Sequence, residues 1–389
     1  MATLKRERSS SIADDDATLH VASRPRLGQA EGHEASASSS TEGCAPVHVE
    51  IAVDGDLVII INETVSDQSQ EIVPTKSQAT AFTVRSSTVF AASKTLKAAL
   101  LGHDSRKPIS EENWTIQLYG DRPKPWATLF HIMHTHFKEV PSDSPDMVQI
   151  HHIALLADKY DLTHLLRPWA RQWIEYLGKN YTIHQSVWCL HISWIFGDAE
   201  LFKSMLNIIA RRSTMSIKLV QSQANPYQIN FGGMNLDDTG IPDFSVVIVG
   251  KLRLEKLKAI LERLEESVDD LIHGVFRASA GIQCRSSDAD IYTEDCNQKI
   301  LATLLRSLAQ AKLWPVPKAE SVERSFVMTW LAVRKLTVVS EPKHKRLGCN
   351  SVFTDALEGW EKTLPRGTLT DAQLQHLKAQ GEKTGLVRS

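Results

Sequence analysis

The apolar pattern of the sequence is strand-like up to Tyr119, apart from one helical stretch from Ser87 to Gly102, and helical beyond it. This contrast most constrains the fold. As far as Tyr119, apolar residues gather in short β-branched runs: VHVEIAV (47–53), LVIII (57–61), AFTVR (81–85) and TIQLY (115–119). Such runs, separated by turn residues such as Asp54-Gly55-Asp56, are typical of β-strands. Beyond Tyr119 most apolar residues recur at steps of three and four, which is the period of a helix. The sequence therefore predicts an α+β chain with a small sheet and a mostly α-helical C-terminal region.

The helical segments can be placed from their apolar steps and their end signals. One helix is expected from Ser87 to Gly102, between the third and fourth strands, and Pro168 predicts a kink or a later start in the helix near His164–Leu177. The residues over 221–241 are rich in Gly, Pro, Asn and Asp, so a long loop is expected there. The other expected segments are helices from Pro125, after Ser144-Pro145-Asp146, after Asp198, from Pro242 to about Phe276, near Gln298–Ala311 and near Ser325–Lys335, then a polar, basic segment from Glu341.

Composition and charge limit the class of protein. The chain has 389 residues, of which 42% are apolar and 23% charged, with a formal net charge of −2. These values are ordinary for a soluble protein and give no global field that would attract nucleic acid or an anionic membrane. The first 46 residues hold few large apolar side chains and are predicted to be disordered. No stretch is apolar enough to span a membrane, and five widely spaced cysteines fit a reducing compartment, so cytoplasm or nucleus is expected.

Particular phrases within this order of elements resemble the BTB/POZ domain, in the branch common in filamentous fungi. DGDLVIII (54–61) is similar to the opening strand of that fold, and FTVRSSTVFAASKTLKAALLG (82–102) to its strand and first helices. HIMHTHFKEVP (131–141) and LLADKYDLTHLLRPWARQWI (155–174) resemble phrases of the fungal branch. The resemblance covers roughly Val47 to Gly178 and implies a small mixed sheet with a helical cluster. The predicted organisation is a disordered segment (1–46), a BTB/POZ domain (47–178), a helical extension with its long loop (179–280) and a small helical C-terminal region (281–389).

The resemblance implies that the chain binds other proteins and is not an enzyme. Members of the family self-associate, recruit corepressors or dock on a cullin ubiquitin-ligase scaffold. The leading hypothesis is an adaptor or scaffold; the alternatives are a transcription cofactor recruited by a DNA-binding partner and an enzyme with a site in the C-terminal half. No GxSxG, phosphate-binding loop or GxGxxG motif supports catalysis, and no module supports direct binding to nucleic acid. For self-association through the first strand, we favour a monomer or weak dimer.

Two groups of residues contain metal-ligand side chains. The histidines at 131, 134, 136, 151 and 152 lie in a region that the resemblance assigns to a structural turn, so no metal is expected there. Cys284, Cys296, His344 and Cys349 supply three thiols and an imidazole, which is a ligand set of structural zinc. Eleven residues separate the first two and four the last two, without a CxxC pair. This spacing favours free buried thiols and a surface histidine, with structural zinc as the alternative and no other cofactor.

The helix from Pro242 carries apolar residues at alternating steps of three and four. They are Leu254, Leu257, Leu261, Leu264, Val268, Leu271 and Val275. A coiled-coil partner helix would need this stripe, and so would a single helix that packs on its own domain. The second arrangement is the commoner one, and we favour it.

Overall fold

The computed structural model describes residues 45–62, 79–101, 114–141, 146–217, 227–273, 282–286 and 291–387. The segment predicted to be disordered, 1–46, lies almost entirely outside these residues. Within them the chain is α+β, as predicted, with two small sheets and a helical C-terminal region. None of the helices in the described ranges has the length and apolar character needed to cross a membrane.

The first sheet contains the four strands predicted from the β-branched runs. They are β1 (Val47–Glu50), β2 (Leu57–Asn62), β3 (Thr80–Val84) and β4 (Trp114–Tyr119). The order across the sheet is β1-β3-β2-β4: β2 and β3 are antiparallel, whereas β1 with β3 and β2 with β4 are parallel. Leu57, Ile59 and Ile61 alternate along β2 and are fully buried, because alternate side chains of a strand point to one face.

The single helix predicted from Ser87 to Gly102 is two helices, α1 (Ser86–Ala92) and α2 (Lys94–Leu101). Ser93 interrupts the helical period, because its backbone is extended and its hydroxyl is engaged elsewhere. The Oγ atom donates to the carbonyl of Tyr160 at 2.5 Å and accepts the Leu96 N–H at 3.1 Å. The second of these bonds satisfies a backbone donor in the first turn of α2.

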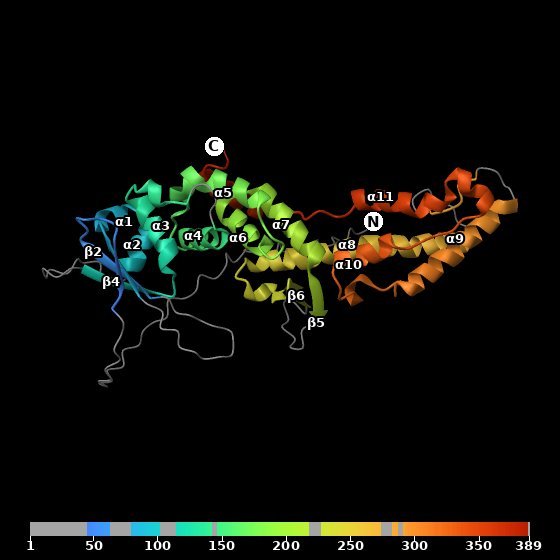
Figure 1. Cartoon of the computed structure of the whole chain (residues 1–389), viewed down its shortest axis with the longest axis horizontal. Coiled ribbons are helices and arrows are strands. Elements are labelled where there is room, and N and C mark those ends of the chain that lie inside the picture. Colours follow the sequence, from blue (N-terminus) through green and yellow to red (C-terminus); the bar gives the residue numbers. More distant parts are fainter. Residues whose placement is uncertain are drawn as a thin grey trace, which may run out of the picture. The chain divides into compact units, whose positions relative to one another are not determined.

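Five helices follow the first sheet along the chain (Figure 1): α3 (Pro123–Met133), α4 (Met147–Lys159), α5 (Arg167–Lys179), α6 (Ser186–Phe196) and α7 (Ala199–Arg212). Of these, α3 contacts β3, α4 packs on α3, α6 on α4 and α7 on α6, so the helices extend away from the sheet. The predicted later start at Pro168 is confirmed, because α5 begins at Arg167 after a short 3-10 helix, η2 (Thr163–Leu166). Asp198 caps α7 as predicted, accepting the Leu201 N–H at 2.8 Å.

The prediction of a long loop over 221–241 is wrong. A second sheet occupies part of it, formed by β5 (Thr214–Ile217), β6 (Tyr227–Phe231) and β7 (Met234–Asn235), followed by the 3-10 helix η3 (Leu236–Asp238). Gly232 and Gly233 both have positive φ and form the turn between β6 and β7. Turn residues that indicated a loop thus belong to a tight connection between strands.

The C-terminal half is helical, with more helices than predicted. The long helix α8 (Asp243–His273) is confirmed, α9 (Ile291–Gln310) starts earlier than expected, and α10 (Phe326–Arg334) matches its prediction. The polar segment predicted from Glu341 instead contains two short 3-10 helices, η5 (Pro342–Leu347) and η6 (Cys349–Ser351), and the helices α11 (Val352–Lys362) and α12 (Asp371–Thr384). The apolar face of α11 is buried. The charged residues around it hid the helical spacing of these apolar residues in the sequence.

Two hydrophobic cores lie along the chain, and α8 contributes to both. The first core joins the sheet to α3–α7, includes the start of α8 as far as Leu252, and receives Leu377 from α12. The second core begins at Leu257 and gathers residues of α8, α9, α10 and α11. The heptad residues Leu257, Leu261, Leu264 and Val268 are buried in this second core, so the stripe packs within the chain, as favoured.

Candidate metal centre

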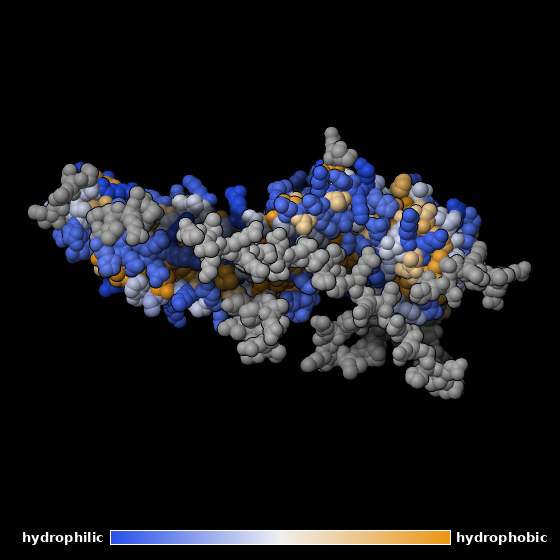
Figure 2. Space-filling view, turned by 180° about the vertical axis from the view of Figure 1, so that it is seen from behind, coloured by the Kyte–Doolittle hydropathy of each residue, from blue (hydrophilic) through white to orange (hydrophobic). Residues whose placement is uncertain are grey.

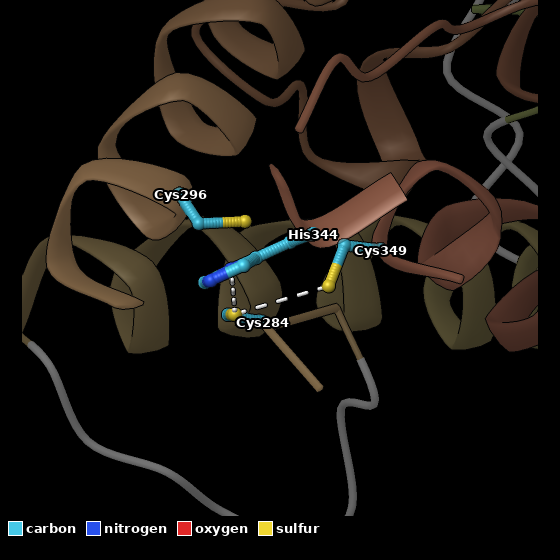
Figure 3. A group of neighbouring side chains, drawn as sticks. All are labelled: Cys284, Cys296, His344 and Cys349. Atoms are coloured by element: carbon cyan, nitrogen blue, oxygen red, sulfur yellow. Dashed lines mark hydrogen bonds between the residues drawn. The ribbon is translucent and has the colours of Figure 1, made fainter. Parts of the chain in front are cut away.

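The four residues identified as zinc candidates lie together in the C-terminal half (Figure 3). Cys284 is on a short segment without regular secondary structure, and Cys296 is on α9. His344 is on η5 and Cys349 begins η6. All four side chains are buried, and their ligand atoms lie within 4.8 Å of one another. Within the described part of the chain, this is the only convergent group of three or more metal-ligand side chains.

Two distances between ligand atoms can be compared with those of a tetrahedral zinc site. The Sγ atoms of Cys284 and Cys349 are 3.8 Å apart, and Cys284 Sγ is 3.1 Å from His344 Nδ1. A zinc ion about 2.3 Å from each sulfur would place two tetrahedral sulfurs about 3.8 Å apart. The two cysteine sulfurs are therefore at the separation that a shared zinc ion requires, and the imidazole needs only a small shift outward.

Backbone groups around the cluster point their N–H bonds at the sulfurs. The Arg285 N–H donates to Cys349 Sγ at 3.3 Å, and the Ser286 N–H donates to Cys284 Sγ at 3.4 Å. The Asn297 side chain accepts the N–H of Cys284 at 2.8 Å and so ties this ligand to α9. Donors directed at sulfur stabilise a thiolate, which is the form that binds metal.

Burial has the opposite effect on the free thiols. It raises the pKa of Cys296 to about 12, against a backbone hydrogen bond from Glu341 that lowers it, and it also raises the pKa of Cys284. A thiol in these surroundings stays protonated at neutral pH unless a cation replaces the proton. A divalent metal supplies that cation, so the same residues that make poor free thiolates make a suitable closed metal site.

The ligand set determines what such a metal would do. Three thiolates and one imidazole are a soft ligand set that suits zinc in a tetrahedral site. Four protein ligands fill the coordination sphere, whereas a catalytic zinc keeps a position for water or substrate. The arrangement therefore suits a structural role.

The prediction that His344 lies on the surface is wrong, because its side chain is 4% exposed and packed against Cys284.

The histidines near the end of α3 lie apart from the Cys284, Cys296, His344 and Cys349 cluster. The ring centroids of His131 and His136 are 5.8 Å apart, and those of His134 and His136 are 6.3 Å apart. Both ring nitrogens of His134 are used within the fold: Nδ1 donates to the Phe130 carbonyl at 2.9 Å, and Nε2 accepts the Arg85 N–H at 3.0 Å.

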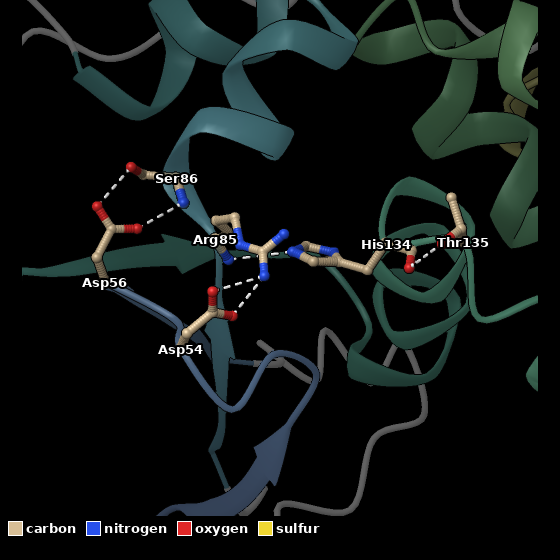
Figure 4. Close-up of polar contacts among 6 residues, drawn as sticks. All are labelled: Asp54, Asp56, Arg85, Ser86, His134 and Thr135. Atoms are coloured by element: carbon tan, nitrogen blue, oxygen red, sulfur yellow. Dashed lines mark hydrogen bonds and ion pairs between the residues drawn. The ribbon is translucent and has the colours of Figure 1, made fainter.

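Figure 4 shows the contacts that surround His134 at the junction of β3 and α1. The Arg85 guanidinium contacts both carboxylate oxygens of Asp54 at 2.6 Å. Asp56 accepts the backbone N–H and the hydroxyl of Ser86 at 2.7 and 2.8 Å, and so satisfies donors at the first turn of α1. His134 therefore belongs to a junction that holds the sheet and α3 together.

Several residues around the metal centre could not be identified from the sequence. They are Arg285, Asn297, Gly348 and Asp355, which contact the ligands or the turns that carry them. Gly348 directly precedes Cys349 and has φ +74°, so a glycine beside a candidate ligand was the one local signal present.

Compared with known proteins, the chain matches no protein-family model and no curated protein.

Proposed function

We propose that the chain is a protein-binding adaptor whose C-terminal helical region is held together by a structural zinc ion. The observation that carries the zinc assignment is the convergence of three buried cysteines and one buried histidine from four separate segments. Zinc bound there would cross-link the Cys284 segment, α9, η5 and η6. Such a cross-link stabilises the folded chain, because the site forms only when these segments are assembled.

Metal content tests the zinc assignment directly. We expect one zinc per chain in protein purified without chelator, and little zinc after Cys296→Ala, because loss of one thiolate opens the site. Cys189→Ala is the matched control, since Cys189 is a fully buried cysteine of the first core. The control should keep its zinc. A wild-type chain without zinc, or equal metal loss in both variants, would contradict the assignment.

The adaptor assignment is supported by the order of elements in the first half of the chain. The BTB/POZ resemblance implies a small mixed sheet followed by a cluster of helices. In keeping with it, the antiparallel strands β2 and β3 are followed by two short helices, then by β4, which is parallel to β2, and then by α3–α5. In that family the fold itself carries no chemistry and its surfaces bind proteins. Recruitment to a cullin ubiquitin ligase is the leading proposal, with corepressor recruitment as the alternative.

The surface of the first half of the chain has a groove and exposed apolar residues that a partner protein could contact. A shallow groove is lined by α1, α3 and η2, through Ser87, Thr88, Ala91, Ala92, Ile132, Met133, His164 and Leu165. Val53, Tyr119 and Phe137 are exposed in the same half. In Figure 2 hydrophilic residues cover most of the visible face, and hydrophobic residues surface in several small areas among them. Small apolar areas with polar surroundings suit binding to a protein surface.

Two substitutions test the adaptor assignment in the full chain. Ala91→Arg places a charged side chain in the groove, whereas Ala99→Arg places one on an exposed part of α2 that does not line it. Both alanines are exposed helix residues, so neither change should disturb the core. Affinity purification with quantitative mass spectrometry should show partners that wild type and Ala99→Arg retain and Ala91→Arg loses.

The identity of those partners separates the alternatives. Cullin subunits among the lost partners would support the adaptor, and chromatin proteins would support the cofactor. If all three chains retain the same partners, the groove is not the binding surface.

A further inference from the structure

Cys284 differs from the other three ligands in how it is held. Cys296, His344 and Cys349 belong to helical elements of the C-terminal half. Cys284 lies on an irregular segment, and the residue as a whole is the most exposed of the four at 8%, against 0% for Cys296 and Cys349. Its position therefore depends on individual contacts of its segment.

The residue after Cys284 makes contacts that fix this segment to the Cys349 turn. The backbone N–H of Arg285 donates to Cys349 Sγ at 3.3 Å, and its guanidinium pairs with the carboxylate of Asp355 in the first turn of α11. The guanidinium also lies over Gly348, where a methyl group would come within 2.8 Å of Arg285 Nη1. One side chain thus spans from the Cys284 segment to both sides of Cys349.

The carboxylate that receives Arg285 is itself held in place. The Ser351 Oγ atom lies 3.0 Å from Asp355 Oδ2 and 3.0 Å from the Gly348 carbonyl oxygen, and its one proton is shared between these two acceptors. These bonds connect Gly348, the residue before Cys349, to the partner of Arg285. A shift of Arg285 would therefore affect the orientation of both Cys284 and Cys349.

We propose that Arg285 is a positioning residue of the metal centre, and that opening of its contact with Asp355 is the step by which the metal enters and leaves. The proposal rests on the proposed zinc function. The side chains of Arg285 and Asp355 are 42% and 49% exposed, so water can compete for this contact while the thiols below it stay buried. When the contact opens, Cys284 can move out with its segment and uncover the metal.

A purely stabilising surface ion pair would behave differently. Exposed pairs contribute little to global stability, whereas groups that orient metal ligands change metal affinity about 10- to 100-fold when removed. The rate of metal release therefore distinguishes the two roles.

The experiment compares zinc release from the full-length, zinc-loaded chain to an excess of a chromogenic chelator. Arg285→Gln and Asp355→Asn each remove the ion pair and keep the backbone N–H that reaches Cys349. Both should release zinc about tenfold faster than wild type, and the double variant no faster than either single one, because the same contact is lost. Lys258→Gln is the matched control: Lys258 is an exposed cation on α8 paired with Glu262. Its release rate should equal that of wild type.

The outcomes separate this proposal from the zinc assignment. A wild-type chain that holds one zinc, with Arg285→Gln and Asp355→Asn releasing it as slowly as Lys258→Gln, would overturn the role of Arg285 alone. A wild-type chain that holds no zinc would overturn both. If Arg285→Gln fails to fold, the nearly isosteric Asp355→Asn decides by the same criterion.

Discussion

His151 and His191 show how burial sets the chemistry of single residues in the first core. His151 Nε2 lies 3.3 Å from His191 Nδ1, between α4 and α6, and both side chains are buried. Burial lowers the pKa of His151 to about 3, with the neighbouring His191 as a further cause, and burial lowers that of His191 to about 4. Both rings are therefore neutral in the folded chain at physiological pH, and one donates to the other.

This pair predicts a dependence of stability on pH. In the unfolded chain each histidine titrates near 6.5, so below that pH the unfolded state binds more protons than the folded state. The stability associated with the pair is present above pH 6.5 and is lost as pH falls toward 4. Each histidine contributes a slope of up to about 1.4 kcal/mol per pH unit. In urea unfolding between pH 7 and 5, His191→Gln should show a slope shallower by about one proton. An unchanged slope would contradict a neutral buried pair.

At the scale of elements, the chain runs back after α11 towards the first half of the molecule (Figure 1), and its last helix, α12, packs against α5, α6 and η2. Thr384 Oγ1 donates to the Phe196 carbonyl at 2.6 Å, and Lys383 pairs with Asp161 at 2.9 Å. The helices approach closely at Gly197 and Gly381. A methyl group at Gly197 would lie 2.0 Å from the Gly381 nitrogen, and Gly197 has φ +83°. The docking of α12 therefore requires glycine at this position.

Gly197→Ala should lower the free energy of unfolding by at least about 2 kcal/mol, since it adds a backbone clash to a left-handed residue. Gly359→Ala is the control, because Gly359 lies in α11 with no atom near the position of an added methyl group. That change should be neutral or stabilising by up to about 1 kcal/mol. Both values can be measured by urea unfolding. Equal effects of the two substitutions would show that α12 does not pack closely on α6.

The elements that could be predicted from the sequence are those with a strong local period. The four strands of the first sheet, α8 and the start of α5 all follow from apolar spacing or a proline. Ser93 was missed because its hydroxyl bonds to Tyr160, which is far away in the sequence. The position of α12 was missed for the same reason: its buried residues include Gln380, Gly381 and Thr384, which carry no apolar signal. Contacts between distant segments override local patterns in such places.

The candidate site was predictable in composition but not in geometry. The sequence identified all four candidate ligands, yet their spacing lacks the short cysteine pair by which zinc sites are recognised. Their convergence depends on how α9, η5 and η6 assemble around the second core. Arg285 and Asp355, which are 70 residues apart, show no local pattern at all.

At the scale of the whole molecule, α8 passes through both cores, and Arg253 lies where one gives way to the other. This arginine is fully buried, and it donates to the carbonyls of Ser213, Val322 and Arg324 at 2.5 to 3.1 Å. The first core also extends past the predicted boundary at Gly178, into α6, α7 and α8. We therefore expect the sheet and its helices to depend on the segments that follow them for full stability.

The most direct test of the account is amide hydrogen exchange of the full chain with and without a zinc chelator. Exchange reports local opening, and the proposed zinc holds α9 to the turn that precedes α11. Chelation should increase exchange strongly in α9 and α11 and leave α3 and α4, in the first core, as protected as before. If chelation leaves α9 and α11 unchanged, or exposes all four helices equally, the Cys284, Cys296, His344 and Cys349 cluster is not the structural zinc centre of the C-terminal region.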